Sequence, residues 1–284
     1  MTFKIKTNLT DVMSYVYLLV FFAIEAFPIY WLFSGAFKPY DQIVNPKYVI
    51  PTKFTLEYFI GSDPHISILA NPSFFVQFRN TLILSFGTSL ITMSISSLAG
   101  YAFSRYKFPF SRTIAWIILF AYLFPATYLI LPMTFWLAQF NLIDNLLGAI
   151  LAQSLFTIPF STYILAGYFA SLPREVEESA LVDGCGPIGM LLRIVIPLSA
   201  PGFVAVFMYS FLMAWNSYLI PLCLLNDRNL WTLPMGIAGM IVGDVIPWGS
   251  LFAMSAVYSI PSIILFFILN KYMVAGLTKG AVKY

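Results

Sequence analysis

Long unbroken runs of apolar residues dominate the hydrophobic pattern of this chain. Six of these runs are long enough to cross the hydrocarbon core of a bilayer, which takes about 20 helical residues. Charged residues lie mostly near the ends of the runs and in the segments between them. The runs are 12–37, 81–103, 113 to about 137, 146–170, 201–225 and 248–269. The pattern therefore predicts six membrane-crossing segments.

These segments are expected to be helices, because backbone polar groups in lipid must be paired within the segment. Four of the prolines inside the runs are expected to kink their helices, because proline has no N–H to donate. They are Pro125, Pro132, Pro159 and Pro261. The expected fold is an all-α integral membrane protein with six transmembrane helices.

Composition and charge agree with this fold and add an orientation. The chain is 60% hydrophobic and 10% charged, which is more apolar surface than one soluble core of 284 residues can bury. With the N terminus inside, ten of the 15 basic residues fall on cytoplasmic segments, so both termini are predicted to be cytoplasmic. A net charge of +3 is too small to indicate nucleic acid as a partner. The first run is longer than the apolar part of a signal peptide, about 7 to 15 residues, so it is expected to stay as an anchor in a multi-pass cell-membrane protein.

The sequence lacks the residue groupings on which enzyme chemistry usually depends. His65 is the only histidine, so neither a Cys and His zinc site nor a Ser-His-Asp triad can form. Cys185 and Cys223 fall on opposite sides of the membrane in this topology, which excludes a disulfide between them. The phosphate-binding pattern GxxxxGK[ST] is absent. We therefore expect a protein that is not an enzyme and that binds no cofactor or metal of its own.

Acidic residues gather between the fourth and fifth runs, where the sequence EESALVDGCGPIGMLLRIVIP occupies positions 177–197. Three glutamates within 175–178 complement the positive end of a short helix that begins near Pro173 and ends at Gly184. Pro187 is suited to begin a second short helix, which two further prolines end. The apolar face of that second helix is expected to consist of Ile188, Leu191, Leu192 and Ile194. The alternative is a surface loop that only connects two spans.

The same segment resembles a known motif, the EAA loop of the membrane subunits of binding-protein-dependent ABC importers. The motif is E-A-A-x3-G-x9-I-x-L-P, and this chain has Ser179 at its second position and Ile196 in place of the leucine. In such importers the loop docks in a cleft of the ATPase and couples ATP-driven closure to the permease. The resemblance assigns this coupling role to Glu178, Ser179, Ala180, Asp183, Gly184, Ile194 and Pro197.

Further stretches resemble the smaller permease of maltose-type carbohydrate importers over nearly the whole chain. They include FKPYDQI after the first run, AGYAFSRYKF closing the second, AWNSYLIPL in the fifth and GLTKGAVKY at the C terminus. This resemblance implies a type I ABC importer permease fold. It divides the chain into a first helix with its outer loop (1–75), a transmembrane core with the coupling loop at 171–200 (76–270), and a cytoplasmic tail (271–284).

The resemblance also implies partners. They are a second permease subunit, two ATPase subunits that bind ATP and Mg, and an extracytoplasmic solute-binding protein, all assembled in membrane lipid. The function implied is half of the translocation pathway of an ATP-driven sugar importer. A permease of the same type for a non-sugar solute such as a polyamine is the alternative.

Two places in the apolar runs carry candidate substrate contacts. Trp215, Asn216, Ser217 and Tyr218 offer aromatic faces and hydrogen bonds, which is what a sugar ring needs. For Trp215 and Tyr218 we favour an interfacial position instead, because such rings gather at the membrane surface. Glu25 lies well inside the first run, where a carboxyl is a candidate proton carrier. We favour a carboxyl that faces the bundle interior or the outer headgroups and is bonded to another helix, and keep a proton-coupled secondary transporter as a less favoured alternative.

Overall fold

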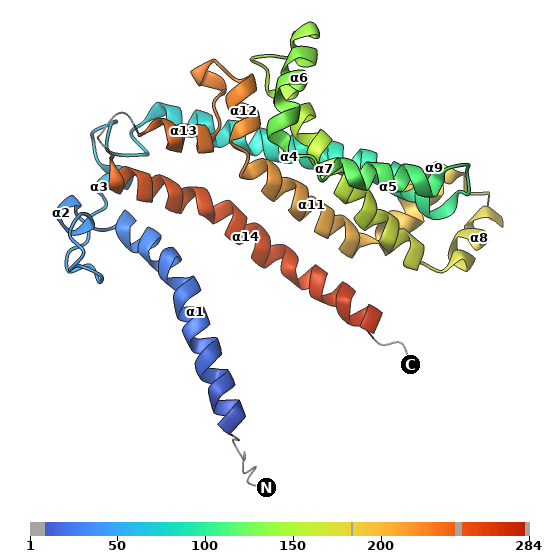
Figure 1. Ribbon diagram of the computed structural model, residues 1–284, viewed down its shortest axis with the longest axis horizontal. Coiled ribbons are helices and arrows are strands. Elements are labelled where there is room, and N and C mark those ends of the chain that lie inside the picture. Colours follow the sequence, from blue (N-terminus) through green and yellow to red (C-terminus); the bar gives the residue numbers. More distant parts are fainter. Residues whose placement is uncertain (1–8, 183, 242–245, 282–284) are drawn as a thin grey trace. The chain divides into compact units, whose positions relative to one another are not determined.

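The computed structural model describes residues 9–182, 184–241 and 246–281, and every regular element in these ranges is helical (Figure 1). Four described helices are long and apolar enough to cross a membrane, and two bent pairs of helices raise the number to six if each pair is one span. The all-α membrane fold is therefore confirmed. The four continuous helices are α1 (Leu9–Ala36), α4 (Pro72–Arg105), α7 (Leu146–Ser171) and α14 (Trp248–Ala281).

The third predicted helix is instead two helices, α5 (Ser111–Ala121) and α6 (Ala126–Gln139), which meet at 100°. Pro125 lies at the break, where it has no N–H to continue the ladder of α5. Pro132, in contrast, lies inside α6. One proline at a point where the chain turns thus produces a full break rather than the expected kink.

The fifth predicted helix is also interrupted. Its first part, α11 (Ala200–Trp215), ends before residues 216–218, and α12 (Leu219–Leu224) follows. At its other end, α11 meets the helical segment Pro187–Leu198 at 85°. The expected single helix over 201–225 was therefore wrong, and its candidate substrate residues lie at a break rather than in one helical turn.

Residues 1–72 and 239–259 form one compact unit. The loop after α1 is held by Lys38, which is buried, donates to the Val49 carbonyl at 3.1 Å and lies 4.2 Å from the centre of the Trp31 ring. Burial lowers the pKa of Lys38 from its ordinary value. The Ser250 hydroxyl donates to the Ile66 carbonyl at 2.7 Å. Besides α1 and the start of α14, this unit has α2 (Tyr40–Ile43) and α3 (Glu57–Ile60).

Residues 73–238 and 260–284 form the second compact unit. In its core, α7 packs against α5, α6, α11 and α12. Its shorter elements are α8 (Arg174–Val182), α9 (Pro187–Met190), the π-helical turn η1 (Leu191–Val195), α10 (Ile196–Leu198), η2 (Arg228–Leu230) and α13 (Leu233–Gly239). The predicted division at residues 75 and 270 follows the family resemblance rather than these units, and it stays a prediction.

The contact between α4 and α7 is lined with small polar residues. The hydroxyls of Thr92 and Thr157 lie 2.6 Å apart, and Ser96 donates to the Ile158 carbonyl at 3.2 Å. At Gly100 a Cβ would meet the backbone of α7 within about 3 Å, which is tighter than ordinary contact. Small side chains therefore let these two helices approach closely, and the hydroxyls of Thr92 and Ser96 are paired within the contact.

Candidate functional site

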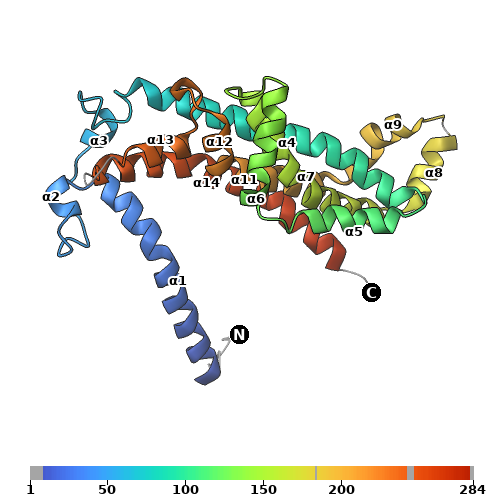
Figure 2. The same cartoon turned by 45° about the horizontal axis from the view of Figure 1, so that its top comes forward.

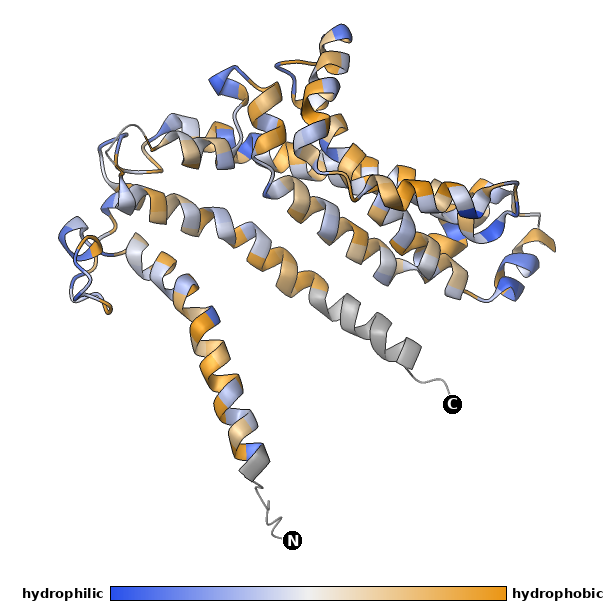
Figure 3. Cartoon of the chain, in the orientation of Figure 1, coloured by the Kyte–Doolittle hydropathy of each residue, from blue (hydrophilic) through white to orange (hydrophobic). Residues whose placement is uncertain are grey.

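The predicted coupling loop lies at one end of the second unit, where α8 lies at the tip and α9 lies beside the end of α4 (Figures 1 and 2). Helix α8 carries hydrophilic residues, in contrast to the largely apolar α11 (Figure 3). It begins directly after Pro173 and ends in a turn at Gly184, whose φ is +79°. In this turn Gly184 N–H donates to the Leu181 carbonyl and Cys185 N–H to the Ala180 carbonyl, both at 3.0 Å. These two bonds are those of a Schellman motif, so the predicted short helix with a glycine end is confirmed.

The two faces of α8 differ in what they meet. Glu178 and Ser179 are exposed, whereas Glu177 and Ala180 are buried against the second unit. Glu178 lines a hollow of about 200 Å³ between α8 and the end of α4. The other predicted coupling residues lie along the same loop, with Ile194 half-buried and Pro197 exposed, while Asp183 lies outside the described residues. Their roles in coupling stay predictions.

The apolar face predicted for the second helix of the loop was wrong in part. Ile188 and Leu192 are 70% and 59% exposed, and the residues that enter the core are Met190, Leu191 and Val195. Residues 191–195 form a π-helical turn, which is wider than an α-helical turn and shifts the inward-facing positions along the chain. The buried residues join a core cluster that also contains Tyr101, Leu165, Phe169 and Val206.

A buried ion pair holds α8 to the end of α4. Arg105 donates from Nε to Glu177 Oε1 at 2.7 Å, and its Nη2 lies 2.6 Å from the same oxygen. The Tyr101 hydroxyl donates to Glu177 Oε2 at 3.0 Å. The sequence interpretation took Arg105 for a topology signal and Glu177 for a helix-dipole residue. One feature of the sequence indicates that Glu177 is buried: its spacing from Ala180 places both on one face of a helix and Glu178 on another.

The structure places the four candidate sugar-contacting residues in different environments. Trp215 is fully buried, with its ring stacked on Phe211 at 5.6 Å and edge-on to Phe78 at 5.9 Å. Its expected interfacial position was therefore wrong, because the ring fills the protein core. Asn216 and Tyr218 are exposed at the break after α11.

A cavity of about 760 Å³ lies where the break between α11 and α12 faces the break between α5 and α6. Asn216, Ser217 and Tyr218 line it together with Tyr122 and Gln153. The Gln153 side chain is 3% exposed, and its Oε1 has no hydrogen-bond partner among the described residues. The cavity therefore has aromatic surface, and a buried amide oxygen without a described partner lies in its wall.

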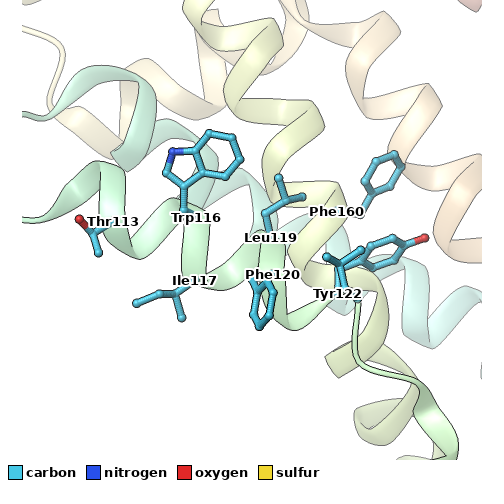
Figure 4. Close-up of a pocket in the computed structure, with 8 residues that line it drawn as sticks. Thr113, Trp116, Ile117, Leu119, Phe120, Tyr122 and Phe160 are labelled. Atoms are coloured by element: carbon cyan, nitrogen blue, oxygen red, sulfur yellow. The ribbon is translucent and has the colours of Figure 1, made fainter.

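A second hollow, of about 590 Å³, lies on α5 and has an apolar lining (Figure 4). Its walls include Trp116, Ile117, Phe120 and Tyr122, with Phe160 contributed by α7 (Figure 4). Such a lining suits lipid chains or apolar side chains rather than a polar solute.

Glu25 is exposed on the surface of α1. Within the described part of the first unit, no hydrogen bond or ion pair holds its carboxyl, so the expected bond to a neighbouring helix is not seen there. Its surroundings on α1 are apolar, with Ile24 64% and Phe27 51% exposed. Among the described residues, no group is bonded to this carboxyl that could exchange a proton with it.

Known transport proteins resemble this chain in sequence and in fold. A family model described as a binding-protein-dependent transport system inner membrane component matches residues 92–279. The trehalose/maltose transport system permease protein MalG of Thermococcus litoralis is 32% identical over 90% of this chain and 91% of its own length. The inner membrane ABC transporter permease protein YcjP of Escherichia coli is 29% identical over 98% of each chain.

The fold has a close counterpart among solved structures. A chain in the crystal structure of a bacterial ABC transporter involved in the import of the acidic polysaccharide alginate matches with a TM-score of 0.78. The match covers 96% of this chain and 99% of the other at 22% identity, so the ABC importer permease fold is confirmed. Because the family model spans residues 92–279 and the relatives align over nearly their full length, the chain belongs to the family of binding-protein-dependent transport system inner membrane components.

Proposed function

We propose that this chain is a permease subunit of an ATP-driven sugar importer and forms half of its translocation pathway. The named substrates of its relatives support a carbohydrate, since MalG is a trehalose/maltose permease and AraQ of Bacillus subtilis, 30% identical over 90% of this chain, belongs to an arabinooligosaccharide transport system. The family consists of components of binding-protein-dependent transport systems. We therefore propose neither an enzyme nor a proton-coupled secondary transporter as the function.

The proposed partners are a second permease subunit, two ATPase subunits that bind ATP and Mg, and an extracytoplasmic solute-binding protein. The last partner is supported by an alginate transporter of the same fold, which was crystallised in complex with an alginate pentasaccharide-bound periplasmic protein. In this assembly both termini of the chain are placed in the cytoplasm, as the distribution of basic residues indicates.

The observation that carries the coupling role is the division of α8 into two faces. Glu177 and Ala180 bind the helix to the membrane-embedded unit, whereas Glu178 and Ser179 face outward, where a partner can reach them. Because α8 is bound on one face and accessible on the other, an ATPase that moves α8 would also move α4 and α7. A loop that only connects α7 to α11 needs no such division.

The proposed solute pathway includes the cavity at the two helix breaks. Breaks in membrane helices leave polar backbone groups that suit a solute, and transporters commonly bind solute at such places. Gln153, Asn216 and Ser217 offer hydrogen-bonding groups, and Tyr122 and Tyr218 offer aromatic faces for a sugar ring. Trp215 supports this wall from within the core and does not reach the solute.

The test is uptake by the complete transporter in proteoliposomes. With ATP inside the vesicles and loaded binding protein outside, a radiolabelled disaccharide is expected to accumulate, and the ATPase subunits are expected to co-purify with the chain. Accumulation of a polyamine in place of the sugar would contradict the substrate class. Uptake that persists without ATP and without binding protein would contradict the proposed mechanism.

The cavity has its own test. Gln153→Leu removes the buried amide oxygen at nearly constant volume, and it is expected to raise the sugar concentration needed for half-maximal transport about tenfold, as for the loss of one substrate hydrogen bond. The matched control is Gln139→Leu at the end of α6, outside the cavity lining. Equal transport by the two variants would contradict a role for the cavity in solute binding.

A further inference from the structure

One buried cluster joins four separate pieces of the chain at the cytoplasmic end proposed for the second unit. Arg105, the last residue of α4, binds Glu177 on α8 and also donates from Nη2 to the Leu172 carbonyl at 3.2 Å. Leu172 is the residue that ends α7. The Tyr101 hydroxyl binds Glu177 and lies 3.2 Å from the sulfur of Met190 at the end of α9. The ends of α4 and α8 and the residue after α7 therefore meet at one guanidinium and one carboxylate, and the end of α9 joins them through the Tyr101 hydroxyl.

The cluster is complete and largely buried. The Arg105 and Glu177 side chains are 9% and 11% exposed, and each oxygen of the carboxylate has a donor. Taking two charges out of water opposes folding, and apolar residues of similar size often give equal or greater stability at such positions. Stability alone therefore does not explain why charges occupy this place, and their fixed geometry is the property that apolar residues would lack.

Arginine is the side chain that this geometry requires. Its planar guanidinium presents donors in fixed directions, so it can bind the carboxylate of α8 and the final carbonyl of α7 at the same time. With both bonds made, α8 cannot turn about its own axis or slide along α4 without breaking them. Glu178, the next residue along α8, stays on the exposed face.

We propose that Arg105 and Glu177, supported by Tyr101, are positioning residues that transmit movement of α8 to the ends of α4 and α7. The inference rests on the proposed coupling function of α8. It adds a division of labour between two neighbouring glutamates, in which Glu178 meets the ATPase and Glu177 passes the movement into the membrane-embedded helices. Loss of the pair leaves the ATPase bound but disconnects its cycle from transport.

The test measures sugar transported per ATP hydrolysed by the complete transporter in proteoliposomes. Arg105→Met, Glu177→Leu and the double variant with both changes are compared with the wild type. Each single variant is expected to lower sugar transported per ATP at least tenfold while the ATPase subunits still co-purify. The double variant buries no unpaired charge, so it is expected to insert and assemble like the wild type even where a single variant does not, and still to transport with the low ratio. Arg112→Met, which removes an exposed cation near the start of α5, is the matched control and is expected to keep the wild-type ratio.

The outcomes separate this inference from the function on which it rests. A double variant that transports as much sugar per ATP as the wild type would overturn the positioning role and leave the importer function standing. Loss of ATPase binding in the double variant would also overturn it, since the pair would then belong to the docking surface. A wild-type chain that neither binds an ATPase nor requires ATP for uptake would overturn both.

Discussion

Gly184 offers a sharp test of the coupling loop, because its backbone requirement can be separated from packing. Its φ of +79° is a conformation that side chains other than glycine rarely adopt, and a Cβ built there would meet nothing within 4 Å. Any effect of substitution must therefore come from the backbone. A residue other than glycine in the left-handed region costs about 1 to 3 kcal/mol, with β-branched residues at the upper end and asparagine at the lower end.

We expect a graded series at this position. Each 1.4 kcal/mol shifts an equilibrium about tenfold, so Gly184→Val is expected to shift the turn away from its native conformation by roughly 10- to 100-fold. Such a loss moves α8 relative to its partner, and it is expected to abolish sugar-stimulated ATP hydrolysis and transport. Gly184→Asn is expected to retain most activity, because asparagine adopts positive φ more readily than other residues. Glu178→Ala, which leaves the turn intact, is expected to give a partial defect.

The assay is ATP hydrolysis stimulated by sugar-loaded binding protein in reconstituted vesicles, with a pull-down of the ATPase and of the partner permease. Gly184→Val is expected to insert in the membrane and pair with the partner permease, since the site is exposed and distant from the helix cores. Transport at the wild-type rate by Gly184→Val would refute the reasoning and leave the loop a simple connector. Equal losses in the valine and asparagine variants would show that the backbone conformation is not the cause.

Three further predictions concern other parts of the chain. Glu25→Gln is expected to leave ATP-driven uptake largely intact, because an amide replaces a carboxyl that moves no protons; uptake that collapses in this variant and follows a pH gradient in the wild type would contradict it. With both native cysteines replaced by serine, Lys53→Cys is expected to react with an impermeant thiol reagent from outside and Lys107→Cys only after the membrane is opened, and the reverse result would invert the topology. The N–H groups of Asp227 and of the residue before it lower the pKa of Asp144 from its ordinary value of 3.8, so the stabilisation from this carboxylate is present at neutral pH and is lost as the pH falls through the lowered pKa. Asp144→Asn is therefore expected to lower the Tm of the solubilised protein at pH 7 and to approach the wild-type Tm only below about pH 3.8; a Tm difference that is constant across this range would contradict the assignment.

Local signals in the sequence predicted the parts of the fold that depend on local physics. Apolar runs identified the membrane helices, and the glycine after α8 marked a helix end because only a residue that tolerates positive φ completes that turn. Breaks within two of the runs were missed, since a proline inside an apolar run is compatible with either a kink or a full turn. Pro125 and Pro132 have the same local chemistry, yet one lies at a break and the other inside α6.

Contacts between distant parts of the chain could not be read from local patterns. Arg105 and Glu177 are separated by 72 residues, and the spacing of Glu177 and Ala180 indicates a shared helix face but not the residue that Glu177 binds. Trp215 presents the same difficulty, because its ring could belong to the membrane surface or to the protein core, and the apolar run around it does not distinguish the two. Its burial is decided by Phe78 and Phe211, which lie on two different helices.

The hydroxyl-lined contact between α4 and α7 lets these two helices slide past each other over a short distance. Thr157 lies near the Thr92 hydroxyl across the contact and also within hydrogen-bonding distance of the Ser154 carbonyl on its own helix, at 3.2 Å. A hydroxyl with a carbonyl of its own helix in reach can release its partner across the contact and stay bonded, so Thr157 is not left unpaired in lipid during a small shift. Tightly interlocked branched side chains would oppose the same shift, because each step would open voids in the packing. A displacement of one helix at one end of the contact can therefore be transmitted to its other end while the two helices stay packed.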